Sequence, residues 1–290
     1  MKNRLCILLC ACCLGLTGVL SACSPHSAPP LDEPVLVPVS IPYEESISTL
    51  ALYSDIPGMI RLIGYHGGDF VAGTVEVSSG DWVPVIEEID GSVVVKQTSD
   101  IGAYDSGNYT NLWKLSVGDT ESFRFDIRNL RAEGHWNFSG LPVTALTAEL
   151  GDAKNAFTCD EPNPAVMTHW DMRCGTGDVT VEGIVNAACR TMNIEAGSGT
   201  LTLRFGSREL PHDVGVTIQA DSGPVVVSVP SYIPARFTVV GEPPVVTGEG
   251  YVRTDGYSYE NSAYRESTAG FVIDVSISGG TGIIYLDAVP

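Results

Sequence analysis

One short pattern recurs four times in the second half of the chain and limits what this chain can fold into. Each copy has a brief run of alternating apolar and polar residues, then Gly-x-Gly or Ser-Gly, and then a second alternating run. The copies occupy residues 171–183, 189–205, 217–229 and 276–287. A unit this short cannot bury its apolar face alone, so neighbouring units must stack on it. The repetition therefore predicts a continuous stack of similar units.

The alternation inside one copy indicates β-strands. Met192, Ile194 and Ala196 fall on one face of an extended segment, while Asn193 and Glu195 fall on the other. Glycine between the runs suits a tight corner, because it readily adopts positive φ. The predicted corner glycines are Gly175, Gly177, Gly197, Gly199, Gly223, Gly280 and Gly282. We expect an all-β fold of stacked short strands, β-solenoid-like or an elongated sandwich, with little helix outside a signal peptide.

The N-terminus resembles a bacterial lipoprotein signal peptide, which we assign to residues 1–22. Two basic residues precede an apolar stretch over 5–20, which is too short for a comfortable transmembrane helix. The Leu-Ser-Ala-Cys sequence at 20–23 resembles the lipobox. This resemblance implies that Cys23 becomes the first residue and carries a lipid such as palmitate, and several acyl chains together anchor a protein stably. The alternative is an ordinary signal peptide in which Cys23 is incidental.

The remainder divides into a tether and one domain. Residues 23–55 are rich in proline, which disfavours regular elements, so an extended tether from the lipid is predicted. A single β domain is expected over 56–290. Asp90-Gly91 predicts a type I′ hairpin turn within it. The polar, mixed segment 99–135 is predicted to be an insertion.

The charge of the chain excludes one class of partner. With 16 basic and 35 acidic residues, the formal net charge is −19. Nucleic acid binding needs Lys and Arg against phosphate, and an anionic membrane surface repels such a chain in the same way. An acidic, solubilising surface on an exported protein is favoured over a cation-binding function.

Three cysteines remain after the N-terminal segment: Cys159, Cys174 and Cys189. Export permits one disulfide among them, with one thiol left over. Buried free thiols are the alternative. Zinc is disfavoured because these three cysteines include no Cys-x-x-Cys pair, so no metal is expected.

Four tyrosines lie close together in the segment 251–264: Tyr251, Tyr257, Tyr259 and Tyr264. Tyrosine is rigid and amphipathic, so this group is a candidate interaction surface. The alternative is ordinary packing of a hairpin.

The chain from 60 to 287 resembles the bacterial toast-rack domains, which are related to cell-wall-active-antibiotic-response proteins and to adhesin-like auto-transporter domains. The resemblance rests on the opening strands at 60–97, on the Trp, Pro and Gly-Asp pattern at 136–157, and on the repeated copies that contain Gly-x-Gly or Ser-Gly. It departs at 99–135, and only Gly175–Asp178 keeps the aspartate of the family's Gly-Ala-Gly-Asp phrase. It implies an all-β domain of glycine-cornered strands, and some relatives sense envelope stress.

Catalytic motifs are missing from the sequence. No metal-binding histidine motif, nucleophile elbow or phosphate-binding loop occurs, so no cofactor is expected. Paired carboxylates on a β-solenoid would be the one thinkable enzyme site, with Asp178, Glu195 and Asp221 as candidates.

These observations favour a lipid-anchored, outward-facing envelope protein that acts as a non-enzymatic binding module. Its expected place is the outer face of the cell membrane, or the outer membrane of a host that has two. Its expected partners are the membrane, through the lipid, and an envelope protein or a surface glycan, with no nucleic acid. The alternatives are an accessory sensor of envelope stress that acts through a membrane signalling partner and, third, a carbohydrate-active enzyme.

Overall fold

The structure is a computed structural model that describes residues 33–98, 109–206, 209–241, 244–248, 250–266 and 270–289. The predicted signal peptide, Cys23 and the start of the predicted tether therefore lie outside the described residues. In the part that is described, no helix is both long enough and apolar enough to cross a bilayer.

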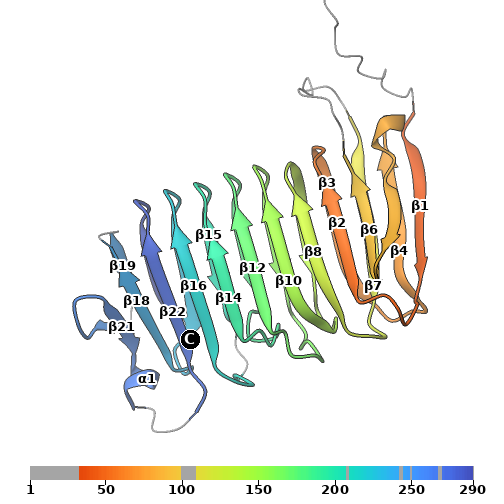
Figure 1. Cartoon of the computed structure of the whole chain (residues 1–290). Helices are drawn as coiled ribbons and strands as arrows, with labels where there is room; N and C mark the ends of the chain where they lie inside the picture. Colours follow the sequence, from red (N-terminus) through yellow and green to blue (C-terminus); the bar gives the residue numbers. More distant parts are fainter. Residues whose placement is uncertain are drawn as a thin grey trace, which may run out of the picture.

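Almost all regular structure is β-strand, and the strands form two facing sheets (Figure 1). Within the described ranges, sheet A has 11 strands in the spatial order β1 (Val35–Pro42), β4 (Asp69–Val77), β7 (Asn111–Gly118), β3 (Gly58–Tyr65), β9 (Ala132–Asn137), β11 (Asn155–Thr158), β13 (Val179–Glu182), β15 (Leu201–Arg204), β17 (Val225–Pro230), β23 (Ile284–Val289) and β19 (Val245–Thr247). Over the same ranges, sheet B has 12 strands in the order β20 (Tyr251–Arg253), β21 (Ser258–Asn261), β18 (Ala235–Val240), β22 (Ile273–Gly279), β16 (Val214–Ala220), β14 (Thr191–Glu195), β12 (His169–Cys174), β10 (Val143–Leu150), β8 (Phe123–Asn129), β2 (Thr49–Ser54), β6 (Ser92–Gln97) and β5 (Val85–Ile89). The described helices are short: the 3₁₀-helix η1 (Gly80–Trp82) and α1 (Ser262–Glu266).

The chain passes back and forth between the two sheets. In the repeat region, β12 of sheet B leads into β13 of sheet A, and the next pair, β14 and β15, lies beside them. We call each such pair of strands a rung. Successive rungs are parallel and pair without offset, so that Trp170 faces Met192 and Val179 faces Leu201. The predicted all-β fold of stacked short strands is thus confirmed, and its strands form two large sheets.

Alternate residues of each rung fill one continuous core between the sheets. Met192 and Ile194 are buried on β14, as the alternation predicts, and so are Leu201 and Leu203 on β15. Aromatic rings occupy the middle of the stack: Phe157 packs against Trp170 with ring centroids 5.6 Å apart. Large fully buried side chains each contribute about 1.5–3 kcal/mol relative to exposure. A single rung has no such partners, which is why the repeats are stable only together.

Narrow corners along one edge of the stack join sheet B to sheet A (Figure 1). Their backbones lie directly on one another. A Cβ atom built on Gly199 would lie 2.1 Å from the carbonyl oxygen of Gly177, and one on Gly223 would lie 2.0 Å from that of Gly199. The Gly223 N–H also donates to the Gly197 carbonyl at 3.2 Å. No side chain fits between corners this close.

The predicted reason for these glycines is therefore wrong, although their positions are right. Of the seven predicted corner glycines, only Gly280 has φ in the left-handed region, at +85°. Gly175, Gly177, Gly197 and Gly282 are, like Gly199, excluded from carrying a side chain by the backbone of the preceding corner. The constraint is space between rungs rather than an unusual backbone conformation.

The predicted tether over 23–55 is wrong for its second half. β1 pairs antiparallel with β4, starting from Val35 opposite Val77, and β2 lies between β6 and β8 with Leu50 fully buried. β1 is the edge strand of sheet A, where a proline without an N–H is tolerated. The folded domain therefore begins at Val35 or earlier, not at 56.

The predicted insertion at 99–135 is also too long. Its first part, 99–108, lies outside the described residues, but β7, β8 and most of β9 fall within the rest. Trp113 and Phe125 from these strands are fully buried. The segment looked polar because charged residues such as Lys114 occupy the outward positions. The predicted hairpin at Asp90-Gly91 is confirmed, since β5 and β6 pair antiparallel across it.

The order of the rungs departs from the order of the chain at both ends. The β2–β3 rung lies between the β6–β7 and β8–β9 rungs. At the other end, β22 and β23 insert between the β16–β17 rung and the β18–β19 rung. Antiparallel strands flank both ends: β1, β4 and β5 at one, and β20 and β21 at the other.

Replacing Gly199 by Ala is expected to destabilise the protein by about 3 kcal/mol, because the new methyl group must displace the Gly177 carbonyl. Urea unfolding of the purified protein measures this free energy. The matched control is Gly80→Ala, where an added Cβ meets nothing within 4 Å, and it should change the stability by no more than about 0.5 kcal/mol. Equal effects of the two substitutions would contradict the close approach of the corners.

Candidate functional site

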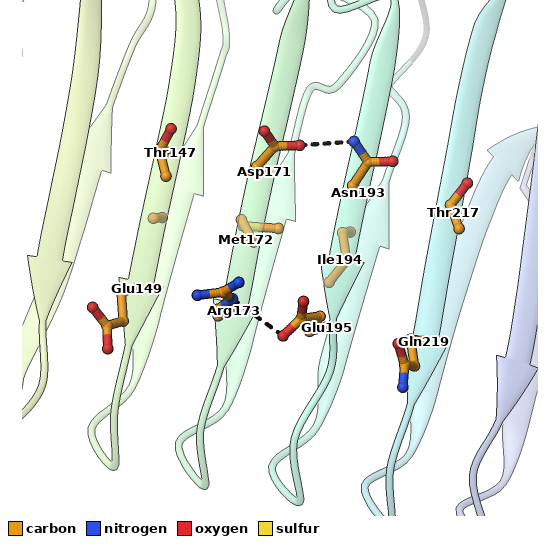
Figure 2. A pocket seen from close by; sticks show the side chains of 11 residues that line it. Thr147, Glu149, Asp171, Met172, Arg173, Asn193, Ile194, Glu195, Thr217 and Gln219 are labelled. Atoms are coloured by element: carbon orange, nitrogen blue, oxygen red, sulfur yellow. Dashed lines mark hydrogen bonds and ion pairs between the residues drawn. The ribbon is translucent and has the colours of Figure 1, made fainter.

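The outer face of sheet B carries a groove of about 480 Å³ that crosses β10, β12, β14 and β16. Two rows of polar side chains border it, because alternate residues of a strand share a face and these strands pair without offset. The first row is Thr147, Asp171, Asn193 and Thr217. The second row is Glu149, Arg173, Glu195 and Gln219. Between the rows run Met172 and Ile194 (Figure 2) and, on β10, Ala148, and the side chains of all three are buried.

Two cross-strand pairs order the middle of this groove (Figure 2). The Asn193 Nδ2 donates to Oδ1 of Asp171 at 2.7 Å. The Arg173 Nε lies 3.2 Å from Oε2 of Glu195. The side chains of Arg173 and Glu195 are 74% and 62% exposed, so their ion pair is worth well under about 1 kcal/mol to the fold. These two pairs fix the positions of side chains on the outer face of sheet B, but they add little to the stability of the domain.

Polar groups beside these pairs are open to a ligand. Thr147, Thr217 and Gln219 are exposed, and their side chains make no hydrogen bond to any described residue. Hydroxyl and amide groups both donate and accept. Because neighbouring strands lie about 4.8 Å apart, the groove offers regularly spaced hydrogen-bonding groups to a chain lying across the strands.

The carboxylates proposed for an enzyme do not converge. Asp178 accepts a hydrogen bond from the Thr200 N–H at 2.9 Å and thereby holds the corner before β13. Glu195 borders the groove, whereas neither Asp178 nor Asp221 does. Throughout the described ranges, no group of three or more His, Cys, Asp and Glu side chains is placed to hold a metal ion.

The four tyrosines do not form one surface. Tyr251 is buried and packs edge-on against Phe237, with ring centroids 5.1 Å apart. Burial raises the pKa of its hydroxyl. Tyr257 is 58% exposed. The packing alternative therefore holds for Tyr251, while Tyr257 remains available to a partner.

The other two tyrosines are engaged by arginines at the same end of the stack. The Arg253 guanidinium lies 5.8 Å from the ring centroid of Tyr259, and that of Arg236 lies 5.3 Å from the ring centroid of Tyr264. The first contact lies within the β20–β21 hairpin, which pairs with β18, and the second joins α1 to β18. This segment is foremost a cap over the last rung.

Cys159, Cys174 and Cys189 are free thiols, so the predicted disulfide is not present. Cys159 and Cys189 are buried, and Cys174, at the end of β12, is half-buried. Burial raises the pKa of each thiol from 9.0 to about 12. The three side chains therefore act as small apolar core groups. The predicted lipidation site, Cys23, lies outside the described residues.

Sequence reasoning missed the groove, although its signal was present. The prediction from the repeated copies used only their apolar residues, which form the core. The polar positions between them, such as Asp171 and Asn193, occur at equivalent places in consecutive copies. Once the register is known, equivalent positions become neighbours on one face, and the rows follow directly.

Comparisons with known proteins leave the function open. No family model matches the chain, and no curated protein matches it. Similar solved structures include a candidate cell adhesion protein from Clostridium sporogenes (17% identity, 89% of this chain and 100% of that chain, TM-score 0.44). Others are a candidate adhesin from Bacteroides fragilis (9%, 89% and 98%, 0.38) and a candidate lipid-binding protein from Parabacteroides distasonis (14%, 89% and 98%, 0.36). The function must therefore come from this chain's own residues.

The thiols of the folded protein are expected to resist alkylation at pH 8, because their pKa near 12 leaves little of the reactive thiolate. Half-buried Cys174 should react first and Cys159 and Cys189 later, and all three should react readily in denaturant. Mass spectrometry of the alkylated peptides gives the three rates separately. Fast modification of Cys159 in the folded protein would contradict its burial.

Proposed function

We propose that this chain is a lipid-anchored envelope protein whose β domain faces outward and binds a partner without chemical turnover. The observation that carries the proposal is the groove of sheet B, where eight polar side chains stand in two rows across four strands. A partner that repeats its hydroxyl groups along an extended chain, such as a surface glycan, matches this spacing best.

The character of the groove favours a neutral chain over a charged one. Its charged side chains are largely matched across strands, since Arg173 faces Glu195 and Arg128 lies 3.7 Å from Glu149. Its remaining groups are hydroxyls, amides and the Asp171 carboxylate, which accepts a hydrogen bond from Asn193. Hydroxyls and amides recognise sugar hydroxyls without a net charge. The parallel sheet below keeps these groups in place before the ligand arrives, which lowers the entropic cost of binding.

The envelope location is proposed from the N-terminal sequence. The Leu-Ser-Ala-Cys sequence at 20–23 is a lipidation signal by resemblance. The first described residues already belong to the domain, and β1 starts at Val35. Only a short link then joins Cys23 to β1, so the domain would sit close to the membrane rather than at the end of a long tether.

Removing the middle of the first row is expected to weaken glycan binding. The double substitution Asp171→Ala with Asn193→Ala removes one cross-strand pair and should weaken binding to neutral linear glycans by about 10-fold or more. The matched control is Thr180→Ala with Thr202→Ala, a cross-strand pair on the outer face of sheet A. An array of neutral glycans probed with the full chain in detergent compares the three proteins.

Either of two results would count against this function. One is that every glycan on the array binds the two double variants with the same affinity. The other is a stable cross-linked complex with a membrane signalling protein on intact cells, which would favour the accessory-sensor alternative. Turnover of a glycan by the purified protein would contradict the non-enzymatic part of the proposal.

Cys23→Ser is expected to release the protein from the membrane fraction and to abolish its labelling by a palmitate analogue, because the acyl chains have no other attachment point. Cys13→Ser, within the apolar stretch of the signal peptide, is the matched control and should leave both properties unchanged. Fractionation of cells with detection of the label measures this. Retention of a labelled Cys23→Ser protein in the membrane would rule the anchor out.

A further inference from the structure

A second surface, on the outer face of sheet A, carries three basic side chains in one row: Lys114 on β7, Arg61 on β3 and His135 on β9. Arg61 stands directly opposite Lys114 on one side and His135 on the other. All three side chains are exposed. We call this group the basic row. Its members are separated only by the strand spacing of about 4.8 Å.

The basic row differs in its charge pairing from three other arginines of the two sheets. Arg173, Arg204 and Arg236 each have a carboxylate at the paired position of a neighbouring strand. Arg61 has cations there instead. Like charges directly opposite each other are destabilising. A chain with 35 acidic residues has many carboxylates to place at such positions, so this arrangement requires a reason other than stability.

The two permanent charges of the row lie outside ion-pair distance of every described carboxylate. Neither Arg61 nor Lys114 forms an ion pair within the described part of the chain, and the Arg61 Nε lies 3.1 Å from the sulfur of Met59. His135 differs, since its Nε2 lies 3.1 Å from Oε1 of Glu133. The positive charge of Arg61 and Lys114 is therefore available to an incoming anion.

A hollow of about 280 Å³ adjoins the row. Arg61 and His135 border it on one side, and Ile63, Asn137 and Thr158 belong to the next row of the same face. The Asn137 Oδ1 already accepts from the Ser139 N–H at 2.9 Å, which leaves the amide N–H groups to donate outward. The hollow thus combines a guanidinium, an amide donor and a hydroxyl beside an apolar floor.

We propose that the basic row and this hollow bind the carboxylate or phosphate of an acidic sugar. Arg61 and Lys114 hold the oxyanion through charge-assisted hydrogen bonds. Asn137 and Thr158 contact the sugar hydroxyls, and the volume suits one ring. A long polyanion is disfavoured because the molecule carries a net charge of −19. At physiological ionic strength the screening length is about 8 Å, so a single anionic group still experiences chiefly the basic row.

The experiment compares three probes with the full chain in detergent: glucuronate, glucose 6-phosphate and glucose. Saturation-transfer NMR titrations are expected to show binding of at least one acidic probe about 10-fold or more tighter than glucose. Glucuronate alone would identify a carboxylate site, glucose 6-phosphate alone a phosphate site, and both together a general oxyanion site. Equal binding of all three probes would overturn the proposal.

The location is tested with Arg61→Gln, which should weaken binding of the acidic probe by about 10-fold or more. The matched control is Arg204→Gln on the same face of sheet A, whose arginine pairs with Glu182; its affinity should equal that of the unmodified chain.

A second readout separates binding from a structural role. Arg61→Gln should keep or raise the melting temperature, because it removes a like charge from the row. Unchanged affinity in Arg61→Gln, or a weakened affinity that comes with a lowered melting temperature, would overturn the assignment. Since the groove of sheet B is intact in this variant, the result is independent of neutral glycan binding.

Discussion

The whole architecture depends on the contact of one backbone with the next at the glycine corners. With no side chain between them, the Gly177, Gly199 and Gly223 corners stack at the distance that the sheet hydrogen bonds require. This contact fixes a register without offset between rungs. Because the register has no offset, outward side chains of equivalent positions stand side by side. Packing at one end of the rungs thereby determines the chemistry of both faces.

Much of this fold follows from local features of the sequence. A period of two residues identifies strands, and repeated glycines identify the corners, so the all-β stack could be predicted from the order of residues alone. The boundaries could not. The prolines of β1 and charged residues such as Lys114 on β7 made these two segments look unlike strands in the sequence. In both cases the edge or outward position of a residue, which only the assembled sheet defines, explains why a strand tolerates it.

The candidate sites were harder to predict than the fold because they depend on pairing between strands. Asp171 and Asn193 are 22 positions apart in the chain, and Arg61 and Lys114 are farther apart still, yet each pair occupies adjacent strands. The tyrosine segment shows the opposite case. Its residues are close in sequence, but Tyr251 enters the core while Tyr257 faces solvent. Proximity along the chain is a poor guide to a shared surface in a stacked sheet.

At the C-terminal end, the order of the strands in the sheets differs from their order in the chain, and this difference affects how the last rung joins the stack. The β18–β19 rung has no parallel neighbour in either sheet until β22 and β23, the last strands of the chain, enter between it and the β16–β17 rung. Because synthesis and export start at the N-terminus, β18 and β19 emerge before the two strands that separate them from the β16–β17 rung. Insertion of β22 and β23 then joins the last rung to the stack, and a chain cut short before Ile273 is left with a detached end rather than merely a shorter stack.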